Sequence, residues 1–138
     1  MGITENEQKK EYLNRYGKLC RQIKRIEQQI RELRRDKICP AIQYDDMPKG
    51  SNQSDLSDYA ARLDELEREY IKQKKEKLAI CDEIKGKIES LDNENEKDVL
   101  IYRYIGLWKW EDICSKMGYS WRQIHYIHSR ALKNINIA

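Results

Sequence analysis

Five side chains near the carboxyl end of this chain have the types and spacing needed to contact the edges of nucleic-acid bases: Trp121, Arg122, Gln123, His125 and Tyr126. Arginine and glutamine are suited to paired hydrogen bonds with guanine and adenine, respectively. A hydroxyl group and three cations lie nearby and could hold phosphates; they belong to Lys109, Ser120, Arg130 and Lys133. We therefore predict a base-reading surface over residues 121–126, with phosphate contacts on either side of it.

A pair of short helices joined by a tight turn is predicted to position these side chains. Gly118 can adopt the left-handed conformation that a sharp reversal requires. Ser120 has the type of a helix N-cap, and Gln123, three residues on, completes a capping box. On the opposite face, an apolar stripe at helical spacing comprises Ile124, Ile127, Ala131 and Leu132. With one preceding helix, residues 92–138 read as a three-helix helix-turn-helix module, although an ordinary three-helix core with a solvated face would show the same spacing.

The segment from Val99 to Ile135 resembles sigma factor region four, a helix-turn-helix module that binds a promoter element. The resemblance runs through Tyr104-Ile105, Trp110-Glu111-Asp112-Ile113, Met117-Gly118-Tyr119-Ser120 and Ile127-His128-Ser129-Arg130-Ala131-Leu132. The segment MPKGSNQSD (Met47 to Asp55), set between two long helices, is similar to small sigma-like regulators of bacterial phages and integrative elements. This resemblance implies double-stranded DNA as a partner, and RNA polymerase as a further one.

Two positions depart from the pattern of region four. Lys109 stands where the family often has a serine or threonine N-cap, and a lysine side chain cannot accept a hydrogen bond from a free backbone amide. Trp121 replaces the usual basic residue at the start of the recognition helix. A tryptophan at this position could pack against a sugar or a thymine methyl group instead of holding a phosphate.

The first two-thirds of the chain predict two long helices. Thr4 and Glu7 have the spacing of a capping box, and a 4-3 apolar seam then runs through Tyr12, Tyr16, Leu19, Ile23, Ile26, Ile30 and Leu33. Pro40 ends this helix, and residues 39–55 read as a loop. A second helix is expected from about Asp55. Its apolar positions are Leu56, Tyr59, Leu63, Leu66 and Tyr70, then, after an interruption at Gln73 and Lys77, Leu78, Cys81, Ile84, Ile88 and Leu91.

Residues 1–91 are thus predicted to form an antiparallel coiled-coil hairpin. Two helices alone bury only a narrow seam, so we expect self-association, most simply into a homodimer. The residues assigned to that interface are Leu19, Ile23, Ile26, Ile30 and Leu33. The fold class is accordingly all-α, with a long hairpin followed by a helix-turn-helix module.

Charge is unevenly distributed along the chain. Residues 9–37 hold 11 Lys/Arg against four Asp/Glu, residues 55–98 hold nine against 14, and residues 99–138 hold six against two. Mutual neutralisation of the two long helices is the simple explanation. Contact with a nucleic-acid backbone is the alternative, and the arginines concerned are Arg15, Arg21, Arg25, Arg31, Arg34 and Arg35.

Other chemistries find little support in the sequence. There is no glycine-rich phosphate loop, nucleophile elbow or H-E-x-x-H motif, so we expect no enzymatic activity and no cofactor. The four cysteines, Cys20, Cys39, Cys81 and Cys114, form no C-x-x-C pair, which favours free buried thiols over a metal site. No signal peptide and no 18-residue apolar run is present, so we expect a soluble cytoplasmic protein without membrane contact.

Three functions fit these features. The favoured hypothesis is a sequence-specific transcriptional regulator of a phage or mobile element. The first alternative is a small phage DNA-packaging subunit that uses the same motif. The second is an interaction protein whose hairpin binds RNA polymerase or another host protein.

Overall fold

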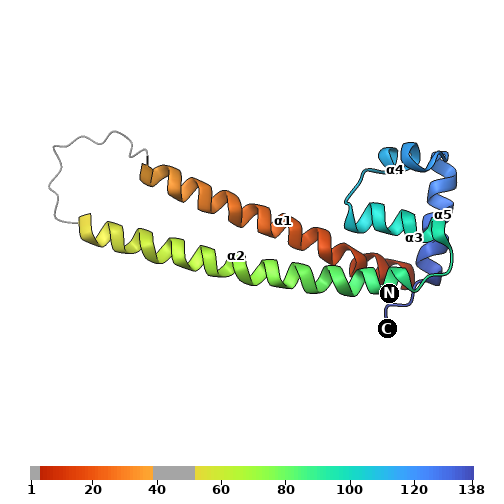
Figure 1. The fold of residues 1–138 in the computed structure, drawn as a ribbon, viewed down its shortest axis with the longest axis horizontal. Helices are drawn as coiled ribbons and strands as arrows, with labels where there is room; N and C mark the ends of the chain where they lie inside the picture. Colours follow the sequence, from red (N-terminus) through yellow and green to blue (C-terminus); the bar gives the residue numbers. More distant parts are fainter. Residues whose placement is uncertain (1–3, 39–51) are drawn as a thin grey trace. The chain divides into compact units, whose positions relative to one another are not determined.

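The computed structural model describes residues 4–38 and 52–138, with side chains for 4–36 and 56–138, and this part of the chain contains helices and turns but no strand (Figure 1). The elements are α1 (Glu5–Ile38), α2 (Asn52–Glu89), α3 (Glu94–Leu100), η1 (Ile101–Ile105), α4 (Trp110–Met117) and α5 (Trp121–Asn134). These elements confirm the predicted all-α fold, in which a long hairpin precedes a helix-turn-helix arrangement. Cys39, Pro40 and the Met47–Ser51 motif lie outside the described residues.

Helix α1 begins at the predicted capping box. The Glu7 amide donates to Thr4 Oγ1 at 3.2 Å, and the Thr4 amide donates to Glu7 Oε2 at 3.1 Å. Along the predicted seam Leu19, Ile23, Ile26 and Ile30 are buried, and Leu33 is half-buried. Tyr12 and Tyr16 are only half-buried, whereas Leu13, which lies off the predicted seam, is fully buried. The first turns of α1 therefore bury a second face besides the seam.

Helix α2 begins at Asn52, so residues 52–55 of the predicted loop are helical instead. Asparagine, serine and aspartate favour helix starts as well as loops, so their presence does not distinguish the two. The seam passes through Gln73 and Lys77, which are half-buried, and continues to the buried residues Ile84, Ile88 and Leu91. The prediction that Leu78 belongs to this stripe is wrong. Leu78 is 67% exposed, because it follows Lys77 directly and so points away from the seam.

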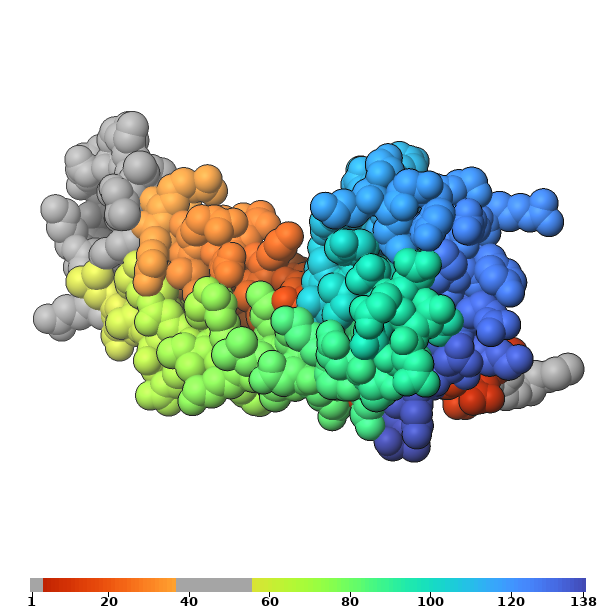
Figure 2. Space-filling model, turned by 45° about the vertical axis from the view of Figure 1, so that its right-hand side comes forward, coloured from red at the N-terminus to blue at the C-terminus, as the bar shows by residue number. Residues whose placement is uncertain are grey.

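The chain divides into two compact units, Met1–Leu19 with Lys77–Ala138, and Cys20–Glu76. In the second unit, the antiparallel helices α1 and α2 lie side by side (Figures 1 and 2) around Ile26, Ile30 and Leu66. Arg34 Nη2 donates to Glu67 Oε1 at 2.7 Å, and the Tyr70 hydroxyl group donates to Glu27 Oε1 at 3.3 Å. Part of the positive charge of α1 is thus neutralised by α2, as the simple explanation of the charge distribution expects.

The same packing overturns the residues predicted for self-association. Leu19, Ile23, Ile26 and Ile30 have exposed fractions of 3–9% within the single chain, and Leu33 packs against the Ile26 cluster. Side chains already buried by α2 cannot also line an interface between copies unless the hairpin opens. The large apolar side chains that the described part of α2 exposes are Leu56, Ile71 and Leu78.

The first unit joins the base of the hairpin to the three short helical segments. One buried cluster contains Leu13, Ile84, Ile88 and Leu91 from the long helices, together with Leu100, Tyr104, Ala131, Leu132 and Ile135. A neighbouring cluster of Val99, Ile113 and Ile124 joins α3, α4 and α5. The boundary predicted between residues 91 and 92 therefore lies inside this unit, and the helix-turn-helix module shares its core with the hairpin.

A strained turn connects η1 to α4. Leu107 has φ +60°, the left-handed region that costs a leucine roughly 1–2 kcal/mol. Two backbone bonds hold it: the Gly106 amide donates to Ile101 O at 2.8 Å, and the Trp108 amide donates to Tyr102 O at 2.9 Å. The Tyr102 and Trp108 rings stack at 4.6 Å. A Cβ on Gly106 would lie 2.9 Å from both Trp108 Nε1 and Tyr102 O, so this close packing requires glycine.

The predicted turn between α4 and α5 is confirmed. Gly118 has φ +71° and ψ +28°, and its amide donates to Cys114 O. The Gln123 amide donates to Ser120 Oγ at 3.2 Å, which makes Ser120 the N-cap of α5. Lys109 precedes α4 without a side-chain cap, as its residue type predicts.

Candidate nucleic-acid interface

The predicted base-reading residues lie mainly on the exposed face of α5. Arg122, Tyr126, Ser129 and Lys133 follow a 4-3-4 spacing and are all exposed, with Gln123 and Arg130 beside them. Tyr126 is 62% exposed and Trp121 54%, which are high values for large aromatic residues. The opposite face buries Ile124, Ala131 and Leu132, as the apolar stripe predicts. Helix α5 carries three cations and no carboxylate, so its free face is suited to an anionic partner.

His125 does not share this exposure. Its ring lies between Trp110, at 4.6 Å, and Trp121, at 4.4 Å. The Nε2 atom is buried and has no hydrogen-bond partner among the described residues. That atom can reach a base only if the stack opens, so the structure gives His125 a packing role in place of the predicted contact. The stack also connects the first residue of α4 to the first turn of α5.

The predicted phosphate-binding residues lie at helix ends. Lys109 and Ser120 are exposed at the N-termini of α4 and α5, where free backbone amides favour anions. Ser120 Oγ accepts from the Gln123 amide, which leaves its hydroxyl hydrogen available for a phosphate. Arg130 and Lys133 are exposed and form no ion pair with any described residue.

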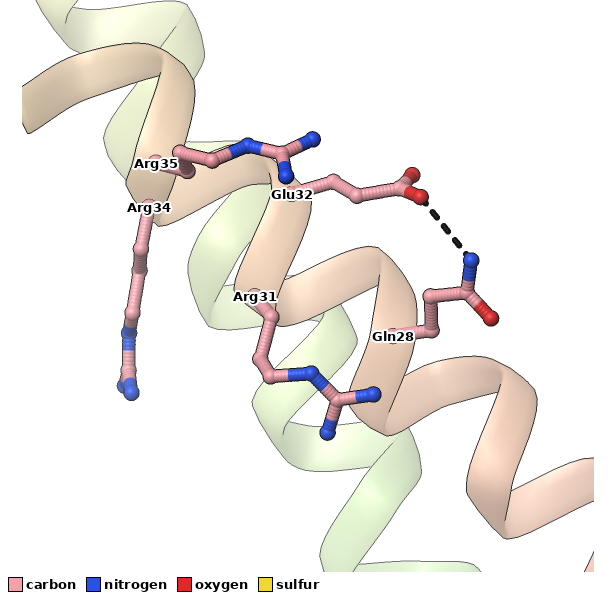
Figure 3. A pocket seen from close by; sticks show the side chains of 5 residues that line it. All are labelled: Gln28, Arg31, Glu32, Arg34 and Arg35. Atoms are coloured by element: carbon pink, nitrogen blue, oxygen red, sulfur yellow. Dashed lines mark hydrogen bonds between the residues drawn. The ribbon is translucent and has the colours of Figure 1, made fainter. Parts of the chain in front are cut away.

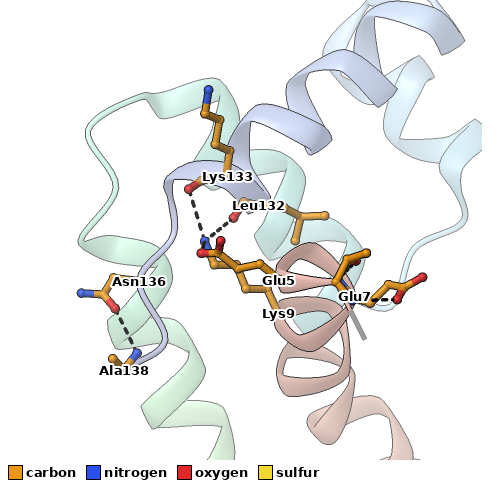
Figure 4. A network of polar contacts seen from close by, with 8 residues as sticks. Glu5, Glu7, Lys9, Leu132, Lys133, Asn136 and Ala138 are labelled. Atoms are coloured by element: carbon orange, nitrogen blue, oxygen red, sulfur yellow. Dashed lines mark hydrogen bonds and ion pairs between the residues drawn. The ribbon is translucent and has the colours of Figure 1, made fainter. Parts of the chain in front are cut away.

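Two buried charged residues, neither of them predicted from the sequence, hold the last turn of α5. Lys9 of α1 donates from Nζ to Leu132 O at 2.8 Å and to Lys133 O at 3.2 Å, and it pairs with Glu5 at 3.4 Å (Figure 4). From α3, Glu96 Oε1 accepts from Asn134 Nδ2 at 2.9 Å. The C-terminal carbonyl groups of α5 are thus capped by a cation from a distant part of the chain.

A third buried polar residue, His128, anchors the middle of α5. Its Nε2 lies 2.8 Å from the Tyr104 hydroxyl group, and Trp110 meets its ring edge-on at 4.8 Å. Burial, helped by the nearby charges of Lys10 and Arg103, lowers the pKa of His128 to about 4. Burial likewise raises the pKa of Tyr104 to about 12. Both side chains are therefore neutral at pH 7, which suits a hydrogen bond inside an apolar core.

The pKa of His128 predicts a dependence of stability on pH. An unfolded histidine titrates near pH 6.5, so between about pH 6.5 and pH 4 the unfolded chain binds a proton that the folded chain does not. Acidification from about pH 7 to pH 4 should therefore lower the free energy of unfolding by up to about 3 kcal/mol through this group. Urea titrations at several pH values measure the effect.

The matched variant for this test is His128→Gln, because glutamine keeps a hydrogen-bonding group beside Tyr104 and does not titrate. Subtracting its pH profile from that of the wild type removes the contribution of the carboxylates common to both. Parallel profiles between pH 4 and 6.5 would show that His128 is not the cause.

Other candidate sites are weaker within the described residues. These residues include no group of three or more His, Cys, Asp or Glu placed to hold a metal ion. Cys20, Cys81 and Cys114 are free thiols, as predicted, but they are half-buried, whereas the sequence predicts that they are buried. None of the described helices has the length and apolar character that a membrane crossing requires. The exposed face of α5 is consequently the candidate site with the most geometric support.

No protein-family model, curated protein or solved structure matches the chain.

Proposed function

We propose that this protein is a sequence-specific regulator of transcription that binds double-stranded DNA through α4 and α5. The supporting observation is the α5 face, where Arg122, Tyr126 and Lys133 stand exposed on a helix that is capped and anchored from behind by buried contacts. In a helix-turn-helix motif the first turns of the second helix meet the base edges, which assigns base reading to Arg122 and Gln123. Lys109, Ser120, Arg130 and Lys133 contact phosphates on either side.

The resemblance to sigma factor region four supports a role at promoters, together with RNA polymerase, in a phage or mobile element. Homodimerisation remains part of the proposal, since two copies would match a two-fold DNA site. Its interface has to lie outside the α1 seam, because that seam is buried within one chain.

Arg122→Ala tests the assignment of base reading. A binding site is first selected from a random duplex library with the purified chain, and the affinity is then measured for that site and each single-base variant. The substitution should cost about 1–3 kcal/mol and relax specificity at one base position, because a paired hydrogen bond to a base edge is lost. Arg122 is exposed and has no partner among the described residues, so the fold should be retained.

Lys116→Ala is the matched control, since it removes one exposed cation of α4 that is not assigned a DNA contact. A uniform loss over all base variants would reassign Arg122 to a phosphate contact. Failure to enrich any site, combined with co-purification of RNA polymerase, would instead favour the interaction protein.

A further inference from the structure

The outer face of α1 in the Cys20–Glu76 unit carries a row of positive charge. Arg21, Arg25, Arg31 and Arg35, here called the arginine row, are all exposed, and Lys24 lies among them. Arg21, Arg25 and Arg35 stand on the side of the helix opposite the buried seam of Ile23, Ile26 and Ile30. Arg31 lies at the flank of that side, where it also lines a hollow with Glu67 and Tyr70 of α2. The row extends over 15 residues, or about 21 Å at a rise of 1.5 Å per step.

Neutralisation within the hairpin does not account for this row. Arg15 pairs with Glu83 at 2.9 Å and Arg34 with Glu67 at 2.7 Å, so these two arginines are used by α2. No residue of the arginine row forms an ion pair with any described residue. Two acidic residues lie beside the row. Glu32 Oε1 accepts from Gln28 Nε2 at 3.0 Å (Figure 3), and Glu27 Oε1 accepts from the Tyr70 hydroxyl group at 3.3 Å. Among the described residues, therefore, the four guanidinium groups have no carboxylate partner and face solvent.

The surroundings of the row indicate what kind of anion. The large apolar side chains exposed by the described residues lie in α2, in the turn after η1 and in α5, and none lies in α1. Protein interfaces usually centre on apolar or aromatic anchors, whereas DNA interfaces are polar and strongly positive. Guanidinium groups also match the geometry of phosphate oxygens. Arg31 and Arg35 line an open hollow of about 570 Å³ together with Gln28, Glu32 and Arg34 (Figure 3).

We propose that the arginine row is a second, sequence-independent binding surface for the phosphate backbone of duplex DNA. It is distinct from the α5 face and does not depend on the proposed regulatory function. The row supplies affinity that depends on salt, and it reads no bases.

A fourfold variant of the full chain tests this surface: Arg21→Gln, Arg25→Gln, Arg31→Gln and Arg35→Gln. Glutamine is a good helix former, and the four positions are exposed, so helicity should be unchanged. The probe is a labelled duplex of random sequence, titrated at several salt concentrations. We expect affinity to fall about tenfold or more and the slope of log K against log salt to flatten by about 2–4, at about 0.9 per lost phosphate contact.

The matched control removes the same number of charges from α2 in the same unit: Arg62→Gln, Arg68→Gln, Lys72→Gln and Lys75→Gln. Both variants change the formal net charge from +3 to −1, so a general charge effect would weaken both equally and overturn the proposal. Polyglutamate is the second probe. Wild-type binding to polyglutamate as tightly as to DNA would also overturn it and would indicate an acidic protein surface.

A third arm separates this proposal from the regulatory one. In a chain carrying Arg122→Ala, Arg130→Ala and Lys133→Ala, random DNA should still bind, and the arginine-row substitutions should remove that binding. Loss of all binding in the triple variant would overturn the second surface while leaving the α5 face supported. Random-DNA binding that is retained in the triple variant, combined with failure of the wild-type chain to select any site, would support the row and contradict the regulatory function.

Discussion

Ile84→Ala, in the second long helix, is expected to destabilise the helix-turn-helix module by about 2–5 kcal/mol. Ile84 is fully buried and belongs to the same cluster as Leu100, Tyr104 and Leu132, so its truncation leaves a cavity beneath α3 and α5. All three tryptophans lie between residues 108 and 121, which makes tryptophan fluorescence a probe of the module alone. Urea unfolding followed by this fluorescence measures the loss.

Leu78→Ala provides the matched control in the same helix. Leu78 is 67% exposed, so the substitution should change the free energy of unfolding by no more than about 0.5 kcal/mol. An isolated fragment of residues 92–138 should fail to fold, because its core is completed by four residues that the fragment lacks: Leu13, Ile84, Ile88 and Leu91. Unchanged fluorescence unfolding in Ile84→Ala, or a folded fragment, would show that the module is independent of the hairpin.

Features set by neighbouring residues could be predicted from the sequence. The capping box at Thr4, the N-cap Ser120 and the left-handed Gly118 each depend on a few consecutive residues, and all three are confirmed. The 4-3 spacing likewise placed Ile23, Ile26 and Ile30 in the hairpin seam. These predictions hold because residue type and helical periodicity act over short distances.

Features set by distant contacts could not be predicted in the same way. Leu13 is buried because α1 meets the helix-turn-helix core, and nothing near it in the sequence indicates that core. The position of His125 in the sequence of α5 predicts a contact with bases, but Trp110 of the preceding helix stacks against its ring. Lys9 could have been found, because extending the α1 seam back by three residues from Tyr12 reaches it. A lysine at a seam position signals a buried cation that needs a partner.

Lys9→Met is expected to lower the free energy of unfolding by about 3 kcal/mol and to weaken binding of the selected DNA site. Two charge-assisted hydrogen bonds, to Leu132 O and Lys133 O, are lost, and each is worth about 1.5–3 kcal/mol. The last turn of α5 then has buried carbonyl groups without their donor, and it should fray. Because Lys133 lies on this turn and Arg130 directly before it, their phosphate contacts should weaken as well.

Lys10→Met is the matched control, since it removes the same charge from the next residue, which is exposed. Lys9→Arg keeps a cationic donor and should recover part of both losses. Amide hydrogen exchange in residues 130–134 distinguishes local fraying from a general loss of stability: faster exchange there under native conditions, in Lys9→Met alone, is the expected result. Equal exchange and equal DNA affinity in Lys9→Met and Lys10→Met would mean that Lys9 contributes only its charge. The end of α5 would then be positioned by Glu96 and Asn134 without help from α1.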